Sequence, residues 1–434
     1  MRDHSHHIEV DRATAIRTLL DNCRFQPESE TVPVSGSFGR VLAEDVFAQL
    51  DMPNCLTCMM DSVAVRWSDF ENGMPDTSEW VKGRDWEFAN TGVGMPEGFD
   101  TAVTVEHVIF SENDTKIRFD AMPSKKYAGT RARGSRMKKG DLLAAKGTVV
   151  TPRIAAHIMG GNILTVEVVR KPRVAFIPTG NELTAANGRT QPEAADGADS
   201  GPIPRGMNIE TNSVMMDGKI RQWGGEPVLF AIIRDEPDAI EKALREAASV
   251  SDIIVLNAGT SKGSDDWSVE VVEKIGKVFY HQITHGPGHH SWFAVIGGIP
   301  VIGISGPPSG ASFTADFYVR PAIMKYLGMP ELTPGLKVRL GSDLPPKKFR
   351  PKTDKHAGET TPVKGGVFFS VRMLRLALAD DGVLEAFPLP DTHWSDASQS
   401  ESAAAYYLLR TAEGLDAPKK GDWIEVDLRP DYLP

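Results

Sequence analysis

The sequence has few cysteines and no long apolar run. Only three of its 434 residues are cysteine, Cys23, Cys55 and Cys58, too few for a disulfide framework. Cys55 and Cys58 form one CxxC pair, but no second pair follows at zinc-ribbon spacing, so a structural zinc is not expected. No run approaches the roughly 18 apolar residues of a membrane span, and the first residues contain no signal-peptide core. We therefore expect a cytoplasmic protein without a membrane anchor.

Positive charge is also scarce. The chain has 48 Lys and Arg against 58 Asp and Glu, a formal net charge of −10. This balance argues against a nucleic-acid partner, because phosphate binding requires clustered cations. The one basic cluster, residues 131–139, is open to two interpretations, a solvated turn or an anion-binding segment. A hydrophobic content of 41% is ordinary for globular proteins, and the length suggests about three domains.

The chain changes pattern twice along its length. Residues 8–24 have helical spacing, and Thr151 before Pro152 is typical of the capped start of another helix. Between these segments short β-rich runs alternate with Gly/Pro turns. From residue 171 apolar strands alternate with amphipathic helices, which predicts a doubly wound parallel sheet. After residue 332 the pattern is β again and predicts a C-terminal barrel or sandwich.

Three loops follow predicted strands of the α/β region: 178–183 (PTGNEL), 232–237 (IIRDEP) and 257–266 (NAGTSKGSDD). Ligands bind outside the carboxyl ends of such strands, so we expect the loops to converge on one pocket. The small residues of the third loop would let a phosphate approach, with Mg²⁺ between the anion and the carboxylates. Alternatively, an aspartate there caps a helix. Glu182 and Asp235 singly would be surface residues, but three carboxylates at one edge favour a shared metal or nucleotide site.

Three histidines lie close together in residues 285–290 (HGPGHH). A transition metal is one interpretation. Adjacent histidines on an extended strand point to opposite faces, however, so a complete metal site would need ligands from elsewhere.

Several segments resemble, in order, the motifs of the molybdopterin molybdenumtransferase (MoeA, gephyrin E-domain) family. Residues 53–65 (PNCLTCMMDSVAV) are similar to its S-x-M-D-G-Y-A signature, and 91–107 (TGVGMPEGFDTAVTVEH) to its TG-x-P-x-P-x-G-x-D segment. PTGNEL resembles STGDEL, and AGTSKGSDD, residues 258–266, resembles GG-x-S-x-G-x-x-D.

The resemblance implies insertion of molybdate or tungstate into adenylated molybdopterin, with release of AMP. It implies a multidomain α/β plus β fold with an α/β molybdopterin-binding domain (8–26 and 172–330), a linker subdomain (27–48 and 140–171), a β-rich insert (49–139) and a C-terminal β-barrel-like domain (331–434). The implied catalytic residues are Asp61, Glu182, Asp235 and Asp266, of which Asp61, Glu182 and Asp266 would hold Mg²⁺. The implied substrate-binding residues are Thr91, Gly92, Arg136, Thr179, Gly180, Gly259, Ser261, Lys262, Gly263, His285, His289 and Ser305.

The sequence departs from the family in its oxyanion motifs. Ser135 and Arg136 stand where the family has the two acids of GED, and Gly286 and His289 replace the lysines of KPGKP. Arg136, Lys262 and the histidines could supply replacement charge. Two alternatives therefore stay open: a non-catalytic paralogue that binds the cofactor, its nucleotide or a protein partner, and a different reaction on a related nucleotide. Candidate protein partners are a molybdopterin adenylyltransferase or a molybdoenzyme.

The resemblance also implies a homodimer. We expect sedimentation velocity at micromolar concentration to give the mass of two 47.3 kDa chains. A folded protein that sediments with the mass of one chain would contradict this prediction.

Overall fold

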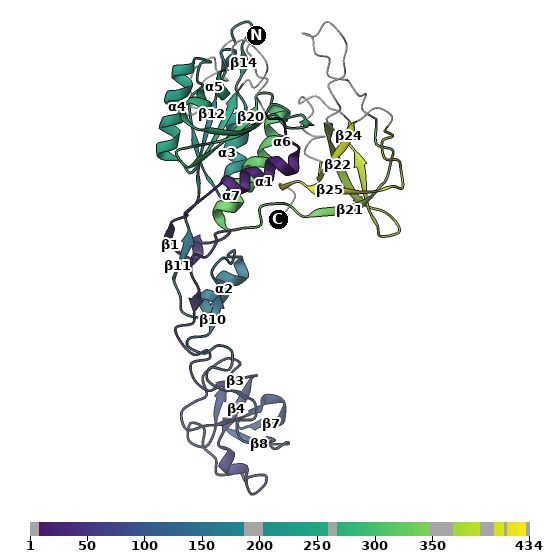
Figure 1. Cartoon of the computed structure of the whole chain (residues 1–434). Coiled ribbons are helices and arrows are strands. Elements are labelled where there is room, and N and C mark those ends of the chain that lie inside the picture. Colours follow the sequence, from purple (N-terminus) through teal and green to yellow (C-terminus); the bar gives the residue numbers. More distant parts are fainter. Residues whose placement is uncertain are drawn as a thin grey trace, which may run out of the picture. The chain divides into compact units, whose positions relative to one another are not determined.

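The chain forms two compact units. The computed structural model describes residues 8–185, 203–258, 267–346, 368–390, 403–411 and 415–430. One unit comprises Met1–Glu28 and Arg170–Pro434, and the other comprises Ser29–Val169. The second unit is thus an insertion in the first, whose chain it interrupts (Figure 1). No helix within the described ranges is long and apolar enough to cross a bilayer.

A six-stranded sheet forms the centre of the first unit. Its strands, in spatial order, are β15 (Glu226–Leu229), β12 (Arg173–Pro178), β16 (Ile253–Ala258), β20 (Ile299–Ser305), β19 (Trp292–Ile296) and β17 (Lys277–His281). The first four pair in parallel, which confirms the predicted doubly wound sheet. The last two pair antiparallel and extend the sheet at one edge, an addition that the strand–helix alternation did not predict.

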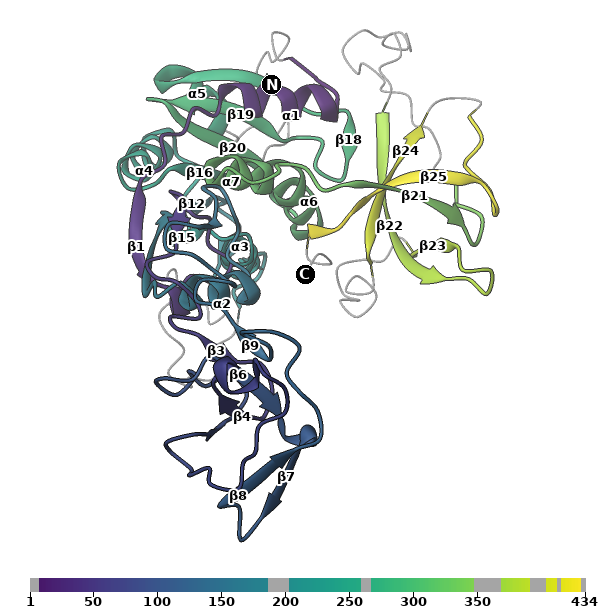
Figure 2. The same ribbon diagram turned by 90° about the horizontal axis from the view of Figure 1, so that it is seen from below.

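Helices cover both faces of this sheet (Figure 2). One layer contains α4 (Pro237–Val250) and α5 (Ser268–Ile275). The other contains α1 (Arg12–Asn22), α3 (Asn212–Gln222), α6 (Pro308–Thr314) and α7 (Arg320–Leu327). Burial on both faces explains why the inner parallel strands β12, β16 and β20 are nearly continuous apolar runs, whereas the edge strand β15 is only partly buried.

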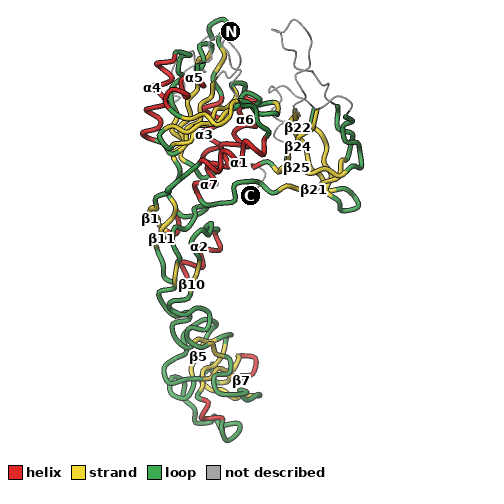
Figure 3. Tube along the Cα trace, viewed as in Figure 1, coloured by secondary structure: helices red, strands yellow, loops and turns green. Residues whose placement is uncertain are grey.

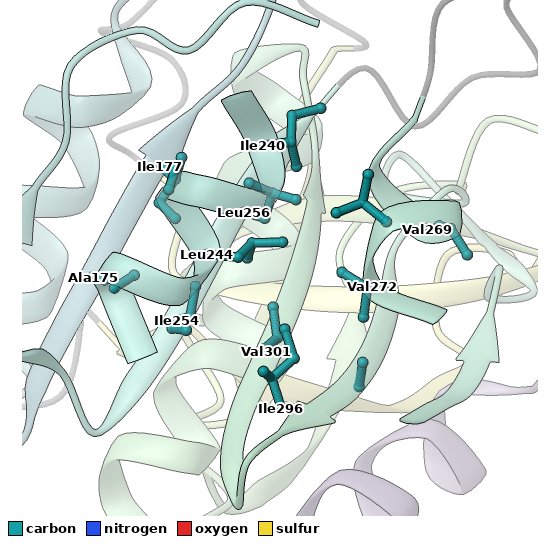
Figure 4. Close-up of a cluster of buried hydrophobic side chains, with 14 of the residues drawn as sticks. Ala175, Ile177, Ile240, Leu244, Ile254, Leu256, Val269, Val272, Ile296 and Val301 are labelled. Carbon is teal, nitrogen blue, oxygen red and sulfur yellow. The ribbon is translucent and has the colours of Figure 1, made fainter. Parts of the chain in front are cut away.

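The apolar side of α4 packs directly on the sheet. Ile240 and Leu244 lie over Ile177 of β12 and Leu256 of β16 (Figure 4). Ile240 and Leu244 are one helical turn apart, and Ala175 and Ile254 of the same core lie two residues before Ile177 and Leu256, so the two periodicities meet in one core.

A π-helical turn, η4 (Ala315–Val319), separates α6 from α7 and contains a buried carboxylate. Asp316 Oδ1 lies 2.6 Å from Nζ of Lys219 on α3, and its Oδ2 accepts a 2.7 Å hydrogen bond from the hydroxyl of Tyr406. All three side chains are buried. We call these three residues the Asp316 cluster; it links two elements of the α/β region to a strand of the C-terminal sheet.

The C-terminal strands close into a barrel. They are β21 (Gly335–Leu340), β22 (Phe368–Leu378), β23 (Leu384–Pro388), β24 (Ala405–Thr411) and β25 (Trp423–Leu428). Closure occurs because β22 pairs with both β23 and β24. A short strand, β18 (His285–Gly286), pairs in parallel with Phe369 and Ser370 near the start of β22. Of the two predicted C-terminal architectures, the barrel is confirmed.

The inserted unit is built from short elements joined by loops (Figure 3). Its strands pair as β1 (Ser29–Pro33) with β11 (Thr165–Val169), β2 (Val46–Phe47) with β10 (Leu142–Ala144), β3 (Thr57–Cys58) with β9 (Thr130–Arg131), β4 (Ser62–Val65) with β5 (Glu87–Ala89) and β6 (Thr101–Thr104), and β7 (Val108–Ser111) with β8 (Lys116–Phe119). Three 3-10 turns, η1 (Val34–Gly36), η2 (Trp67–Phe70) and η3 (Val105–His107), and one helix, α2 (Pro152–Gly160), complete its described elements. Thr151 caps α2 by accepting the Ile154 N–H, as predicted.

The central strand β20 leaves no room for a side chain at Gly303. A Cβ there would lie 2.1 Å from Cε2 of the buried Trp292. Since overpacking a core costs about 1–3 kcal/mol or more, we expect Gly303→Ala to lower the free energy of unfolding by about 3 kcal/mol. Exposed Gly218 of α3 has open space around its Cα, so Gly218→Ala should instead gain up to about 1 kcal/mol. Denaturant unfolding of the wild type and both variants measures these free energies. Equal stability of the two variants would contradict the prediction.

Candidate functional site

Three parallel strands end side by side at one edge of the α/β sheet. Pro178 of β12 is in register with Asn257 of β16, and Ala258 is in register with Ser305 of β20. The loop after β12 continues beside residues 232–237, because Gly180 N–H donates to Ile233 O at 3.1 Å. Two of the three predicted loops therefore meet at this edge. Residues 259–266 of the third loop, with Gly259, Ser261, Lys262, Gly263 and Asp266, lie outside the described residues.

Glu182 and Asp235, the predicted carboxylates of this edge that the structure describes, are on adjoining loops. The Asn181 N–H donates to Oδ2 of Asp235 at 3.1 Å, and the Asp235 N–H donates to Oδ1 of Asn181 at 3.3 Å. This reciprocal pair fixes the Asp235 carboxylate against the loop that carries Glu182. Glu182 itself is exposed, and a two-residue strand, β13 (Leu183–Thr184), follows it and pairs with β14 (Asn208–Ile209). The hydrogen bonds thus place the Asp235 carboxylate beside Asn181, the residue that precedes Glu182.

A buried chain of amides lies beneath these loops. Asn212 Nδ2 donates to Asn257 Oδ1 and to Gly306 O, each at 2.8 Å. Asn257 Nδ2 in turn donates to Ser305 O at 2.8 Å. The amide chain links the first residue of α3 to the ends of β16 and β20. Asn257 is not among the residues predicted from the sequence, although a polar residue at the end of the apolar run IIVLN was a usable signal.

A second group of predicted site residues lies in the inserted unit. Oδ1 of Asp61 accepts from Thr91 N–H at 2.9 Å and from the Thr91 hydroxyl at 3.1 Å. The next residue, Gly92, has φ of 79°, which a side chain would disfavour. The structure therefore brings Asp61, Thr91 and Gly92 together. Arg136 is exposed, and no described carboxylate forms an ion pair with it.

The histidine loop is held by internal hydrogen bonds. His285 is fully buried; its Nδ1 donates to Pro287 O at 3.0 Å and its Nε2 accepts from the Tyr318 hydroxyl at 2.7 Å. Burial lowers the pKa of His285 to about 4. A ring that stays neutral with both nitrogens engaged does not suit the cationic, anion-binding role predicted for it.

The other two histidines of this loop also contact neighbouring groups of the protein. His289 Nδ1 donates to Ile283 O at 2.6 Å, and the His289 and His290 rings lie 4.9 Å apart. No cluster of three or more metal-ligating His, Cys, Asp or Glu side chains occurs among the residues that the structure describes.

Two family models match the chain in succession. The MoeA N-terminal region (domain I and II) matches residues 8–160, and the probable molybdopterin binding domain matches residues 175–325. Several molybdopterin molybdenumtransferases are similar in sequence to this chain. The protein of that name from Haemophilus influenzae is 26% identical over 322 residues, 71% of this chain and 76% of its own length. That from Bacillus subtilis is 28% identical over 330 residues, 70% and 73% respectively.

Solved structures share the fold. A molybdopterin biosynthesis MoeA protein from Pyrococcus horikoshii superposes with a TM-score of 0.72 at 22% identity, covering 97% of this chain and 99% of that one. A molybdenum cofactor biosynthesis protein from Pyrococcus furiosus gives a TM-score of 0.54 at 18% identity, covering 97% and 100%. At these identities the likeness extends to architecture alone.

Burial of His285 makes stability depend on pH. Its pKa is about 4 in the folded protein against an ordinary 6.5, so the unfolded chain binds more protons between these values and stability falls as pH falls from 6.5 to 4. We expect this group to remove on the order of 3 kcal/mol across that window. His285→Gln should lose this part of the pH dependence, measured by denaturant unfolding at pH 4–7, whereas exposed His157→Gln should keep it. An unchanged profile in His285→Gln would refute the assignment.

Proposed function

The chain belongs to the molybdopterin molybdenumtransferase (MoeA, gephyrin E-domain) family, and from this we propose that it inserts molybdate into adenylated molybdopterin and releases AMP. The observation that carries the proposal is the pair of loops with Glu182 and Asp235 at the carboxyl edge of the domain that matches the molybdopterin-binding model. The names of the relatives favour this catalytic role over the non-catalytic alternative.

The reaction couples two exchanges. One water is consumed as a P–O bond of the phosphoanhydride breaks, yielding AMP and molybdopterin phosphate. Molybdate loses one oxygen as water, with the protons of the two dithiol S–H groups, as both sulfurs become its ligands. Both partners are anions, so the site must offset negative charge at the phosphoanhydride and around the oxyanion.

Magnesium fits the donor set at the sheet edge. Mg²⁺ is usually held by one or two carboxylates together with phosphate oxygens, and the adjoining loops offer Glu182 and Asp235. We propose that these two carboxylates hold it, while Asp266 and, in the inserted unit, Asp61 stay predicted ligands. The bound ion would neutralise charge on the phosphoanhydride. The Asn181 N–H keeps the Asp235 carboxylate oriented in this arrangement.

The remaining predicted residues would bind substrate. Thr179, Gly180 and Ser305 adjoin the strand ends, and Thr91 and Gly92 adjoin Asp61. Arg136 and Lys262 are the cations that we propose for molybdate, since charged donors bind oxyanions strongly. The homodimer, the choice between molybdate and tungstate, the protein partners and the cytoplasmic location stay predictions.

The Asp235 carboxylate provides the test. Purified protein is incubated with adenylated molybdopterin, Mg²⁺ and molybdate, and AMP is quantified. We expect Asp235→Asn to reduce Mg²⁺-dependent AMP release by about 10²-fold, because it removes charge while keeping an acceptor for Asn181. The matched control is Asp238→Asn. Asp238 is exposed, lies three residues after Asp235 in the first turn of α4, and its substitution should retain the wild-type rate. A wild type that releases no AMP above the protein-free blank would overturn the proposal.

A further inference from the structure

Two polar atoms below the strand ends lack a hydrogen-bond partner within the described part of the chain. They are the hydroxyl of Thr179 and the carboxamide oxygen of Asn212, in residues only 3% and 5% exposed. Both residues flank Asn257: Thr179 N–H donates to its main-chain oxygen at 2.9 Å, and Asn212 Nδ2 donates to its Oδ1 at 2.8 Å. Buried polar atoms are nearly always partnered, so an unpartnered pair at one place needs an explanation.

The orientation of Asn212 is determined by its neighbours. Its Nδ2 faces two acceptors, Asn257 Oδ1 and Gly306 O. Rotating the carboxamide by half a turn would place an oxygen against two oxygens, so the nitrogen must occupy this position. The other end of the carboxamide is therefore an oxygen, which can only accept hydrogen bonds.

This acceptor lies next to the surface. Thr211 precedes Asn212 on the chain and Pro307 follows Gly306, and both are exposed. Asn212 is also the first residue of the eleven-residue helix α3. The residues that Asn212 contacts, Asn257 and Gly306, lie at the strand ends, so the buried oxygen lies near the same edge of the sheet.

We propose that Asn212 Oδ1 accepts a hydrogen bond from an uncharged N–H or O–H group of adenylated molybdopterin, with the Thr179 hydroxyl bonding to the same part of the ligand. The inference rests on the proposed function. Phosphate oxygens and molybdate cannot be the partner of Asn212, because fully ionised they offer an acceptor no proton. Groups of suitable chemistry are the amino and ring N–H groups of the pterin, the ribose hydroxyls and the adenine amino group.

Thr179→Val and Asn212→Ala test this on the whole ligand. The Kd for adenylated molybdopterin is measured without molybdate, so that binding is separated from turnover. Thr179→Val puts a methyl group of the same size in place of a hydroxyl that makes no hydrogen bond within the described part of the chain. It should therefore leave unfolding unchanged while raising Kd about 10-fold, equivalent to about 1.4 kcal/mol. Asn212→Ala should raise Kd at least as much.

Paired probes then separate a ligand contact of Asn212 from a general loss of structure. AMP is compared with 2′-deoxy-AMP and with inosine monophosphate, and pterin with lumazine, which lacks the 2-amino group. In wild type, deleting the donor that Asn212 binds should cost about 10-fold in affinity, and in Asn212→Ala the same deletion should cost nothing. The pair that shows this coupling identifies the pterin, ribose or adenine as the source.

Two results would overturn the inference in distinguishable ways. If wild type binds adenylated molybdopterin and both variants bind it equally well, only the role of Asn212 and Thr179 is wrong. If wild type does not bind adenylated molybdopterin, the proposed function fails together with it.

Discussion

The parallel pairing of β12, β16 and β20 decides where this protein can act. Because the three strands run in the same direction and in register, their carboxyl ends meet at Pro178, Ala258 and Ser305. Every loop that follows these strands must begin at this edge, and the polar groups needed by a substrate can be offered there without entering the apolar layers. The amide chain from Asn212 to Ser305 lies at the boundary between the apolar core and this polar edge.

The Asp316 cluster imposes a second constraint. A carboxylate removed from water is tolerated only when charge and hydrogen bonds offset its desolvation, and Lys219 and Tyr406 provide both. The hydrogen-bond geometry therefore sets the position of β24 against η4 and α3. Barrel and α/β region are thus joined by directional bonds as well as by apolar contact.

The regular part of the fold was predictable from the sequence. The helical spacing on α4 and the apolar runs of β12 and β16 each indicate one structure, so the doubly wound sheet followed from local pattern. Barrel closure did not, because only the pairing of β22 with both β23 and β24 distinguishes a barrel from a sandwich. The antiparallel edge formed by β17 and β19 was likewise missed.

The candidate site was predictable only in part. Glu182 and Asp235 could be predicted to share one edge because the carboxyl ends of parallel strands lie together. Asp61 and Thr91 were indicated only by the motif resemblance. The surroundings of His285 could not be predicted, because nothing in HGPGHH indicates that Tyr318, distant in sequence, forms a hydrogen bond with its Nε2. Partners of buried polar groups depend on tertiary packing, which residue spacing does not encode.

The insertion of Ser29–Val169 also dictates the order in which the chain can fold during synthesis. Helix α1 is made before the inserted unit, yet it packs on α7, which begins only at Arg320. At a translation rate of about 5–20 residues per second, α1 spends tens of seconds outside the ribosome before that partner exists. The inserted unit closes earlier, when β11 pairs with β1. Helix α1 is therefore made long before it can be buried, and its apolar face must stay protected from aggregation in the interval.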